Sequence, residues 1–332
     1  MLRLVHRDAQ EVLRAKLQDA GFAPVRAELC ARLFVDASRD GVPSHGLNRF
    51  PSFVTSIRAG IVDPSAEPVR VASLGALERW DGRGGPGPLN AYACMDRALD
   101  LARQFGIGAV ALANTNHWMR GGNYGWQAVE AGFIGLCWSN TTPNIPPWGT
   151  AERRVGNNPL VVAVPRAAGP VVLDMALSQF SFGALADYAR RGEQLPVPGG
   201  FDAAGQLTSD PRAIFASGRP LPIGYWKGSG LALALDLIAA LVSGGQATHQ
   251  IGANPAGETA VSQVFIAIQP GWGAPEAREV VANEIVAYFR GNAAPGGYHP
   301  LFPGESSLAQ RADSDAYGIP VDQDVWERIL AL

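Results

Sequence analysis

The feature that most restricts the fold of this chain is a change in its hydrophobic period near residue 69. Before this point, apolar residues recur at the three- to four-residue spacing of amphipathic helices. After it, short runs rich in β-branched and aromatic residues alternate with helix-like stretches. The sequence therefore predicts a helical N-terminal part followed by a sheet-based part.

Three helical segments are expected in the first 60 residues. The first has Asp8 as its N-cap and ends at Gly21, and the second runs from Pro24 to about residue 40. A third segment follows Ser44 and is bent or broken at Pro51. Residues 61–68 are expected to form a linker.

Strands and helices are predicted to alternate from residue 69 onward. The expected strands are Val69 to Leu74, Ala76 to Trp80, Gly108 to Ala113, Phe133 to Ser139, Leu160 to Val164, Val171 to Met175 and Val264 to Ile268. The expected helices are Leu89 to Gln104, Tyr124 to Ala131, Gly183 to Arg191, Gly228 to Leu241, Pro275 to Arg290 and Asp322 to Leu332. The Gly/Pro-rich segment from Pro196 to Gly224 is expected to be a functional or interface loop, with a plain surface excursion as the alternative.

Composition and charge exclude several classes of protein. Of 332 residues, 47% are hydrophobic and 17% are charged, which excludes a disordered chain and a coiled coil. The net charge is -3 and the sequence has no run of basic residues, so neither a nucleic acid nor an anionic membrane is an expected partner. The longest apolar run, Leu231 to Val242, is too short for a bilayer span, and three separated cysteines fit a reducing compartment. We expect a soluble cytoplasmic protein.

Two motif readings are rejected. The glycines at 82, 84 and 87 form a literal G-x-G-x-x-G, but Pro86 and Pro88 remove N–H groups that would cradle a phosphate. No acidic residue follows the next predicted strand to bind a ribose, so a structural Gly/Pro turn is expected. The five histidines and three cysteines show no metal-ligand spacing, and no metal is expected.

His45 and Arg49 suggest a site for an organic acid. His45 stands in a turn with glycines on both sides, and Arg49 is four residues further on, which places both on one face of a helix. Imidazole can exchange a proton near neutral pH, and guanidinium can hold a carboxylate at two points. This combination suits a 2-oxo or 2-hydroxy acid, although a surface histidine beside a structural arginine fits the pattern too.

Three further residues are candidates for a site. His117 lies in a polar loop between a predicted strand and a predicted helix, where ligands usually bind in sheet-based folds. Asp174 ends an apolar strand and can either orient a histidine or cap a helix. Lys227 precedes an apolar helix and can neutralise a phosphate, but the P-loop spacing is absent.

These motifs together resemble the type-2 malate/L-lactate dehydrogenase-like oxidoreductases, which use a nicotinamide cofactor without a Rossmann fold. The resemblance covers nearly the whole chain. It is carried by Ser44-His45-Gly46 with Arg49, Asn114 to Tyr124, Val155 to Leu160, Val172 to Met175, Lys227 to Leu231 and Pro303-Gly304-Glu305. Three positions depart from the pattern of similar members: Asn157 stands in place of threonine, and Glu305-Ser306 in place of His-Glu.

The resemblance implies an α+β fold with two domains and a homodimer with active sites near the subunit interface. Residues 1–68 and 301–332 would form a helical domain from both termini, and residues 69–300 a mostly antiparallel mixed sheet that binds the dinucleotide. His45 would donate a proton with Asp174 as a second catalytic residue, and the substrate, a small keto or hydroxy acid derived from a sugar, would contact Ser44, Arg49, His117 and Asn158. The cofactor, with NAD(H) favoured and NADP(H) as the alternative, would contact Pro170, Val171, Val172, Leu173, Asp174, Met175, Ala176, Trp226, Lys227, Gly304, Glu305 and Ser306.

Other functions stay open at this point. The same cofactor chemistry could act on a cyclic imino acid or on a malate- or lactate-type 2-hydroxy acid. A lyase that uses Lys227 as a Schiff-base nucleophile would need a dry pocket, which the flanking glycines disfavour. A sugar-acid binding protein is the non-enzymatic alternative.

Overall fold

The centre of the molecule is a seven-stranded sheet. The computed structural model describes residues 2–254, 257–271, 274–292 and 299–332. Strand order is β2-β3-β4-β10-β5-β6-β7, and every neighbouring pair is antiparallel except β3 and β4. The strands are β2 (Val69–Leu74), β3 (Leu77–Asp81), β4 (Ile107–Thr115), β5 (Ile134–Ser139), β6 (Leu160–Val164), β7 (Val171–Met175) and β10 (Val261–Ile268). The predicted α+β class with a mostly antiparallel mixed sheet is confirmed.

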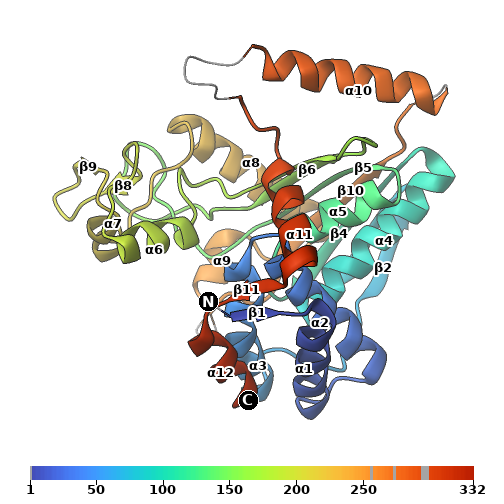
Figure 1. Cartoon of the computed structure of the whole chain (residues 1–332), viewed down its shortest axis with the longest axis horizontal. Helices are drawn as coiled ribbons and strands as arrows, with labels where there is room; N and C mark the ends of the chain where they lie inside the picture. The colour runs from blue at the N-terminus through green and yellow to red at the C-terminus, as the bar shows by residue number, and fades with distance from the viewer. Residues whose placement is uncertain (1, 255–256, 272–273, 293–298) are drawn as a thin grey trace.

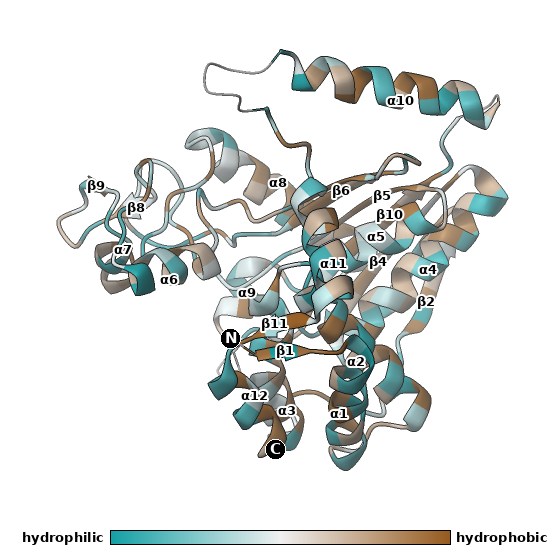
Figure 2. Ribbon diagram, in the orientation of Figure 1, coloured by the Kyte–Doolittle hydropathy of each residue, from teal (hydrophilic) through white to brown (hydrophobic). Residues whose placement is uncertain are grey.

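Helices cover both faces of this sheet (Figure 1). Helices α4 (Gly87–Phe105) and α5 (Gly122–Glu130) pack on one face, and α8 (Trp226–Ser243) packs on the other. Strand β4 contributes apolar side chains to both faces of the sheet. Val110 and Leu112 belong to the core under α4, and Ala111 belongs to the core under α8. Successive side chains of a strand point to opposite faces, so a strand that is apolar at every position is buried on both. Figure 2 shows these apolar strands in the middle of the molecule.

A second core is built from both ends of the chain. It combines α1 (His6–Asp19), α2 (Pro24–Arg39), α3 (Phe50–Arg58) and α12 (Gln323–Leu330). Strand β1 (Leu2–Leu4) pairs with β11 (Ile319–Val321), so the two termini lie side by side (Figure 1). This packing supports the division into residues 1–68 plus 301–332 and residues 69–300, which we keep as a proposal.

Two local predictions in the helical part are wrong. Asp8 does not cap α1, because the helix begins at His6 after Val5, and the Asp8 carboxylate lies inside the first turn. Pro51 does not bend a helix, because the chain after Ser44 forms two short 3₁₀ turns and α3 begins only at Phe50. Proline is tolerated in a first turn, where its missing N–H would have no helical partner.

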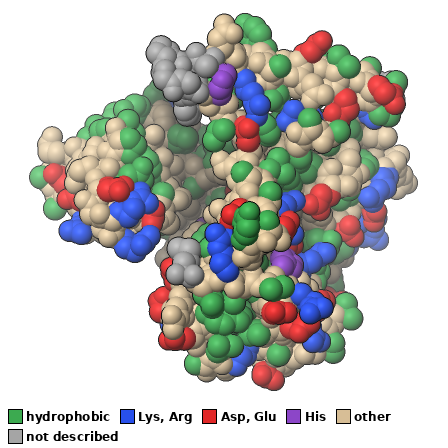
Figure 3. Space-filling model, viewed as in Figure 1, with side chains coloured by type: hydrophobic (Ala, Val, Ile, Leu, Met, Phe, Trp, Pro, Cys, Tyr) green, Lys and Arg blue, Asp and Glu red, His purple; other side chains and the backbone are tan. Residues whose placement is uncertain are grey.

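The segment from Pro196 to Gly224 lies in a small lobe that projects from the sheet (Figure 1). The lobe contains α6 (Phe182–Arg191), the hairpin of β8 (Gly200–Phe201) and β9 (Leu207–Thr208), and α7 (Pro211–Ser217). Its own core is small and centres on Leu185, Leu195 and Ile214. Figure 3 shows the surface hollowed between this lobe and the rest of the molecule.

Two apolar helices have exposed faces. Helix α8 is long and apolar enough to cross a membrane by length and composition alone, yet it packs on the sheet through residues such as Leu235. Its Asp236 carboxylate accepts hydrogen bonds from Asn140 Nδ2 (2.8 Å) and from the Thr248 N–H (3.0 Å), which ties the helix into the fold. Helix α10 (Pro275–Arg290) stands apart from the sheet and has no buried residue (Figure 1). The remaining helices are α9 (Thr248–Gly252) and α11 (Glu305–Tyr317).

Candidate active site

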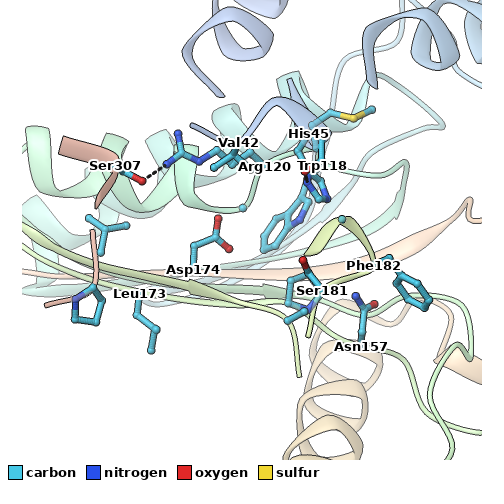
Figure 4. A pocket seen from close by; sticks show the side chains of 18 of the residues that line it. Val42, His45, Trp118, Arg120, Asn157, Leu173, Asp174, Ser181, Phe182 and Ser307 are labelled. Atoms are coloured by element: carbon cyan, nitrogen blue, oxygen red, sulfur yellow. Dashed lines mark hydrogen bonds between the residues drawn. The ribbon is translucent and has the colours of Figure 1, made fainter. Parts of the chain in front are cut away.

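A cavity of about 850 Å³ lies where the helical part, the sheet and the lobe meet. Its walls come from the turns after α2, the loop between β4 and α5, strand β7, the start of α6 and the start of α11 (Figure 4). A volume in this range is typical of sites for small molecules and cofactors. The residues from the sequence prediction that line it are Ser44, His45, Arg49, His117, Val172, Leu173, Asp174, Ala176, Gly304 and Ser306.

His45 and Arg49 both line the cavity, but they do not share a helical face. They lie on two successive 3₁₀ turns, Pro43–His45 and Leu47–Arg49, so the prediction of one helix that carries both residues is wrong. Ser44 Oγ lies 3.0 Å from His45 Nδ1 and orients the ring. The Arg49 side chain is exposed and forms no hydrogen bond or ion pair with the residues that the structure describes. Its guanidinium is therefore available to a ligand.

If Arg49 had a purely structural role, it would be expected to pair with a nearby acid such as Asp40. The Asp40 carboxylate does not bind the Arg49 side chain. The Asp40 carboxylate is instead bound by Arg120 Nη1 (2.7 Å), Arg311 Nε (2.8 Å) and Arg39 Nε (3.2 Å). Burial opposes ionisation of Asp40, but the Arg311 and Arg120 guanidinium groups outweigh it and hold the pKa of the carboxyl below its usual value. This cluster joins α2, the loop before α5 and α11. It braces the cavity wall, and it leaves Arg49 free.

His117 is held in one tautomer. Its Nδ1 accepts a hydrogen bond from the Met119 N–H at 3.0 Å, so the proton of the neutral ring is on Nε2. The His117 ring is stacked on that of His45, with 5.8 Å between ring centroids and 19° between ring planes. The cavity therefore contains two adjacent imidazoles, one of which presents an N–H donor.

The glycine motif at residues 82–87 supports this loop rather than a cofactor. A Cβ atom at Gly87 would lie 2.2 Å from the His117 carbonyl oxygen, so only glycine lets the loop pass over the start of α4. The Asn116 side chain donates to the Gly84 (2.8 Å) and Gly85 (3.0 Å) carbonyl oxygens and closes the turn. These contacts agree with the prediction that the motif forms a structural Gly/Pro turn.

Both histidines are neutral at neutral pH. Burial, with a smaller contribution from the Arg49 charge, lowers the pKa of His117 to about 4. Burial also lowers the pKa of His45 to about 4; His117 and Arg49 contribute to this shift, and the Asp174 carboxylate opposes it. A negative charge placed near Arg49 would raise both pKa values.

Asp174 contributes a hydrogen bond at a helix start and a charge near His45, and it forms no hydrogen bond with a histidine of the described chain. Its Oδ2 accepts a hydrogen bond from the Gly122 N–H at 2.8 Å, at the first residue of α5. Its charge also raises the pKa of His45. In Figure 4 the Asp174 side chain points from the sheet toward the side of the cavity that carries Arg120 and His45. Asp174 thus fixes the loop of His117 and biases His45 toward its protonated form.

Asn158 does not line the cavity, whereas its neighbour Asn157 does. The Asn158 side chain is fully buried: its Oδ1 accepts from the Thr141 N–H (3.1 Å), and its Nδ2 donates to the Ala232 carbonyl (2.8 Å). It is a brace between β6 and α8. Asn157, the residue that departs from the family pattern, faces the cavity in its place.

One wall of the cavity could hold a dinucleotide. It consists of β7 and the segment before α11, which the Val172 N–H joins by donating to the Pro303 carbonyl at 2.8 Å. Gly304 has φ +94°, and a Cβ there would lie 3.0 Å from the Val172 nitrogen, so glycine is needed for this approach. Four of the predicted cofactor residues, Pro170, Val171, Met175 and Glu305, belong to these segments without lining the cavity. Glu305 accepts from the Phe302 N–H and pairs with Arg290, which explains its presence in structural terms.

The same wall has the donors that an anionic phosphate needs. Helix α11 begins at Glu305 with no side-chain cap, and Ser306 and Ser307 of its first turn line the cavity. Arg120 is buried beside them, with Nη2 3.5 Å from Ser307 Oγ and an Nε that has no hydrogen-bond partner (Figure 4). A helix N-terminus with a nearby guanidinium suits a phosphate group. The residues present therefore fit a nucleotide cofactor.

Trp226 and Lys227 lie elsewhere. Both are exposed at the start of α8 and do not line the cavity. Tyr225, just before them, has φ +59°, a strained conformation for a residue with a side chain. The structure therefore brings the substrate and β7 residues together, but leaves Trp226 and Lys227 apart from them.

Other chemistries find little support among the described residues. No group of three His, Cys, Asp or Glu side chains is placed to hold a metal ion. Cys30, Cys94 and Cys137 are buried, and burial raises the pKa of each thiol. Sequence reasoning missed Asp40, Arg120 and Glu258, which are single charged residues from distant parts of the chain without a local motif.

The cavity thus combines an unpaired guanidinium and two imidazoles with a wall suited to a phosphate-bearing cofactor, a combination that fits an oxidoreductase for small acids. The sequence matches the malate/L-lactate dehydrogenase family over residues 5–330, and the chain belongs to that family. It is therefore a member of a family of NAD(P)-dependent dehydrogenases that act on hydroxy and keto acids.

Individual relatives cover the whole chain. It is 46% identical over 308 residues to a 2,3-diketo-L-gulonate reductase of Pasteurella multocida, which covers 92% of each chain. It is 42% identical to the Citrobacter koseri protein of the same name, over 100% of both. Among solved structures, sulfolactate dehydrogenase of Methanocaldococcus jannaschii matches with a TM-score of 0.90 and 28% identity over 99% of this chain and 95% of that one. Δ1-Piperideine-2-carboxylate reductase of Pseudomonas syringae matches with a TM-score of 0.88 and 30% identity over 100% and 99%.

Proposed function

We propose that this protein reduces the 2-keto carbon of a sugar-derived 2-oxo acid, with 2,3-diketo-L-gulonate as substrate and 3-dehydro-L-gulonate as product. The observation that carries the proposal is the free guanidinium of Arg49 beside the stacked rings of His45 and His117, in one cavity with the β7 and α11 wall. The full-length similarity to 2,3-diketo-L-gulonate reductases supports this choice of substrate.

Each polar residue of the cavity has a separate task. Arg49 holds the substrate carboxylate at two points, since it has no competing partner among the described residues. His45 gives a proton to the oxygen of the reduced carbonyl, and Ser44 keeps its ring in place. His117 donates its Nε2–H to the substrate, because Nδ1 is occupied by the Met119 N–H.

The arrangement also explains how His45 becomes protonated. Burial and the neighbouring His117 lower the pKa of His45 to about 4, and the Arg49 charge adds a smaller contribution in the same direction. A substrate carboxylate on Arg49 cancels this effect and raises the pKa of His45. Binding of the acid therefore draws a proton onto His45, and Asp174 stabilises that proton through its charge. Only a substrate with a carboxylate prepares the proton donor.

A nicotinamide cofactor, when bound, supplies the hydride for the carbonyl carbon. The cavity residues that would hold it are Val172, Leu173, Asp174, Ala176, Gly304 and Ser306, with Pro170, Val171, Met175 and Glu305 in the same two segments behind them. Trp226 and Lys227 lie outside this cavity, so we do not assign them to the cofactor site. The first turn of α11 and the buried Arg120 would neutralise its phosphates. We favour NAD(H) over NADP(H).

We also propose that the active form is a homodimer. The α8 side chains Leu233, Leu237 and Leu241 follow one another at helical spacing and are exposed by 54%, 52% and 74%. Helix α10 carries further exposed apolar residues, among them Ile285 and Tyr288. Apolar patches of this kind mark subunit interfaces. Sedimentation at assay concentration is expected to give a dimer, and a fully active monomer would overturn this proposal.

The proposed location is the cytoplasm. The three buried cysteines are unpaired, which agrees with a reducing compartment.

The reaction is tested by following NADH absorbance with 2,3-diketo-L-gulonate, oxaloacetate and pyrroline-2-carboxylate as separate substrates. Fastest turnover with diketogulonate supports the proposal, and turnover of another acid alone would assign the protein to a malate-type or imino-acid activity. In His45→Gln we expect kcat to fall by roughly 10²–10⁴-fold with little change in cofactor binding. Turnover near the wild-type level in this variant would remove His45 from the mechanism.

A further inference from the structure

We propose that Glu258 selects the substrate: its carboxylate accepts a hydrogen bond from a hydroxyl group on the carbon chain of the acid, and it repels a second carboxylate at that place. This inference rests on the proposed function and specifies which 2-oxo acids the cavity accepts. The substrate class it defines is a monocarboxylic 2-oxo acid with a hydroxylated chain.

Glu258 lines the cavity from the segment between α9 and β10, and His45 and Arg49 line the same cavity from the turns after α2. Its side chain is 27% exposed. One carboxylate oxygen, Oε2, accepts a hydrogen bond from Thr142 Oγ1 at 3.4 Å. The other, Oε1, lies 3.9 Å from His117 Nε2, which is too far for a hydrogen bond. A carboxylate can accept several hydrogen bonds, so Glu258 keeps acceptor capacity that faces the cavity.

The pair of His117 Nε2 and Glu258 Oε1 matches the chemistry of a hydroxyl group. Because Nδ1 of His117 accepts from the Met119 N–H, Nε2 is a donor, whereas an ionised Glu258 is only an acceptor. A hydroxyl oxygen beside both can accept from Nε2–H and donate to Oε1. A second carboxylate of a substrate has no proton to donate, and a methyl group can do neither. The two side chains therefore form a site that prefers a hydroxyl.

Charge reinforces this preference. Arg49 is the nearby cation: burial raises the pKa of Glu258, and the Arg49 charge opposes that rise and favours the carboxylate. At His117 the Arg49 charge acts in the same direction as burial and lowers the pKa of the ring. No ion pair within 4.0 Å joins Arg49 to Glu258 in the described part of the chain, so space remains between them. When the carboxylate of the substrate occupies Arg49, the Glu258 charge is no longer balanced by that cation. A dicarboxylic acid would then place a second negative charge near Glu258, and such repulsion is an effective way to reject a wrong substrate.

Asn157, a polar side chain of the same wall, is fixed by its neighbours. Its Oδ1 accepts from Asn144 Nδ2 (2.9 Å) and from Thr141 Oγ1 (3.1 Å), and the Asn157 N–H donates to Asn144 Oδ1 (2.8 Å). These bonds occupy the Asn157 acceptor, so the side chain can offer a ligand only the donor Nδ2. Within this wall Glu258 supplies the acceptor for a hydroxyl group, and His117 supplies a donor beside it.

The test compares three substrates, 2,3-diketo-L-gulonate, oxaloacetate and pyruvate, on the wild type and on Glu258→Gln and Glu258→Leu. In Glu258→Gln the shape and one acceptor remain while the charge is lost, so kcat/KM for oxaloacetate should rise relative to diketogulonate by about tenfold. In Glu258→Leu the acceptor is lost, and kcat/KM for diketogulonate should fall by roughly tenfold or more. Pyruvate has neither feature, so its kcat/KM should stay within about twofold in both variants.

A matched control and a second readout separate this role from a structural one. Glu152→Gln changes an exposed glutamate that pairs with Arg154, so all three substrates should keep their wild-type ratios. Calorimetric binding of L-gulonate and L-malate to the same proteins should show the same loss and gain of affinity without turnover. Substrate ratios that are unchanged in both Glu258 variants, with pyruvate still reduced, would overturn the role of Glu258 alone. A wild type that reduces none of the three acids would overturn the proposed function as well.

Discussion

Substitution of His117 by asparagine should make the protein less sensitive to acid. The asparagine Oδ1 can replace Nδ1 as acceptor for the Met119 N–H, so the loop is retained while the titrating ring is removed. Burial holds the pKa of His117 at about 4 in the folded protein, against 6.5 in the unfolded chain. A depressed pKa means that the folded state binds fewer protons. The stability that neutral His117 contributes is therefore complete above pH 6.5 and is lost as the pH falls toward 4.

The size of the effect follows from the two pKa values. Between pH 7 and pH 4.5, proton linkage at this one group lowers the free energy of unfolding by roughly 2 kcal/mol. The side chain is 24% exposed, so solvent screening reduces the value only moderately. Urea denaturation at both pH values should show that His117→Asn loses about 1–2 kcal/mol less than the wild type.

The comparison needs a histidine that stays in solvent. His249→Asn changes an exposed residue of α9 and should leave the wild-type pH dependence intact. An equal loss of stability in the wild type and in His117→Asn would refute the argument, because it would mean that the ring is already accessible to protons in the folded state.

Three further substitutions test other parts of the structure. Arg49→Lys should lower kcat/KM for the keto acid by an amount equivalent to roughly 1.5–3 kcal/mol of transition-state stabilisation. The melting temperature should not change, since Arg49 has no structural partner among the described residues. The kcat/KM for a neutral analogue without the carboxylate should fall much less. Asp40→Asn should destabilise the fold by roughly 3 kcal/mol in urea denaturation, because it leaves the buried Arg120 charge without its counter-ion; an unchanged midpoint would contradict this. Gly304→Ala should raise the KM for the cofactor several-fold more than it raises the KM for the acid. The reason is that a Cβ at φ +94° pushes the α11 turn away from Val172. An equal rise in the two KM values would argue against this wall as the cofactor site.

Local patterns predict the sheet better than they predict how distant segments meet. The apolar runs at Leu160–Val164 and Val171–Met175 are strands at the predicted bounds, because a short apolar segment between turn residues has few other stable states. The pairing of β1 with β11 is not predicted, since each strand has three residues and the two come from opposite ends of the chain. The 3₁₀ turns at His45 were mistaken for a helix because the spacing of apolar residues cannot distinguish them over so few positions.

The candidate site divides in the same way. His45, Arg49 and His117 are found from sequence because each stands in a glycine-rich or polar loop with a recognisable chemistry. Asp40, Arg120 and Arg311 are not, because each is a single charge on a different element and only the fold brings both guanidinium groups within 2.8 Å of the Asp40 carboxylate. Glu258 likewise has no local signal, and its meaning depends on the tautomer of His117. Asn158 is the opposite case: its sequence motif predicts a substrate contact, but the structure places its side chain in the interior, outside the cavity.

The central claim is that the cavity directs a hydride to the 2-keto carbon while His45 supplies the proton. Transfer from deuterated NADH, labelled at the reactive C4 position, tests it most directly. With 2,3-diketo-L-gulonate in ordinary water, NMR of the product should show deuterium bound to carbon 2 and none elsewhere, and His45→Gln should form the same labelled product far more slowly. Deuterium at another carbon, or oxidation of the cofactor without label in the product, would contradict the account.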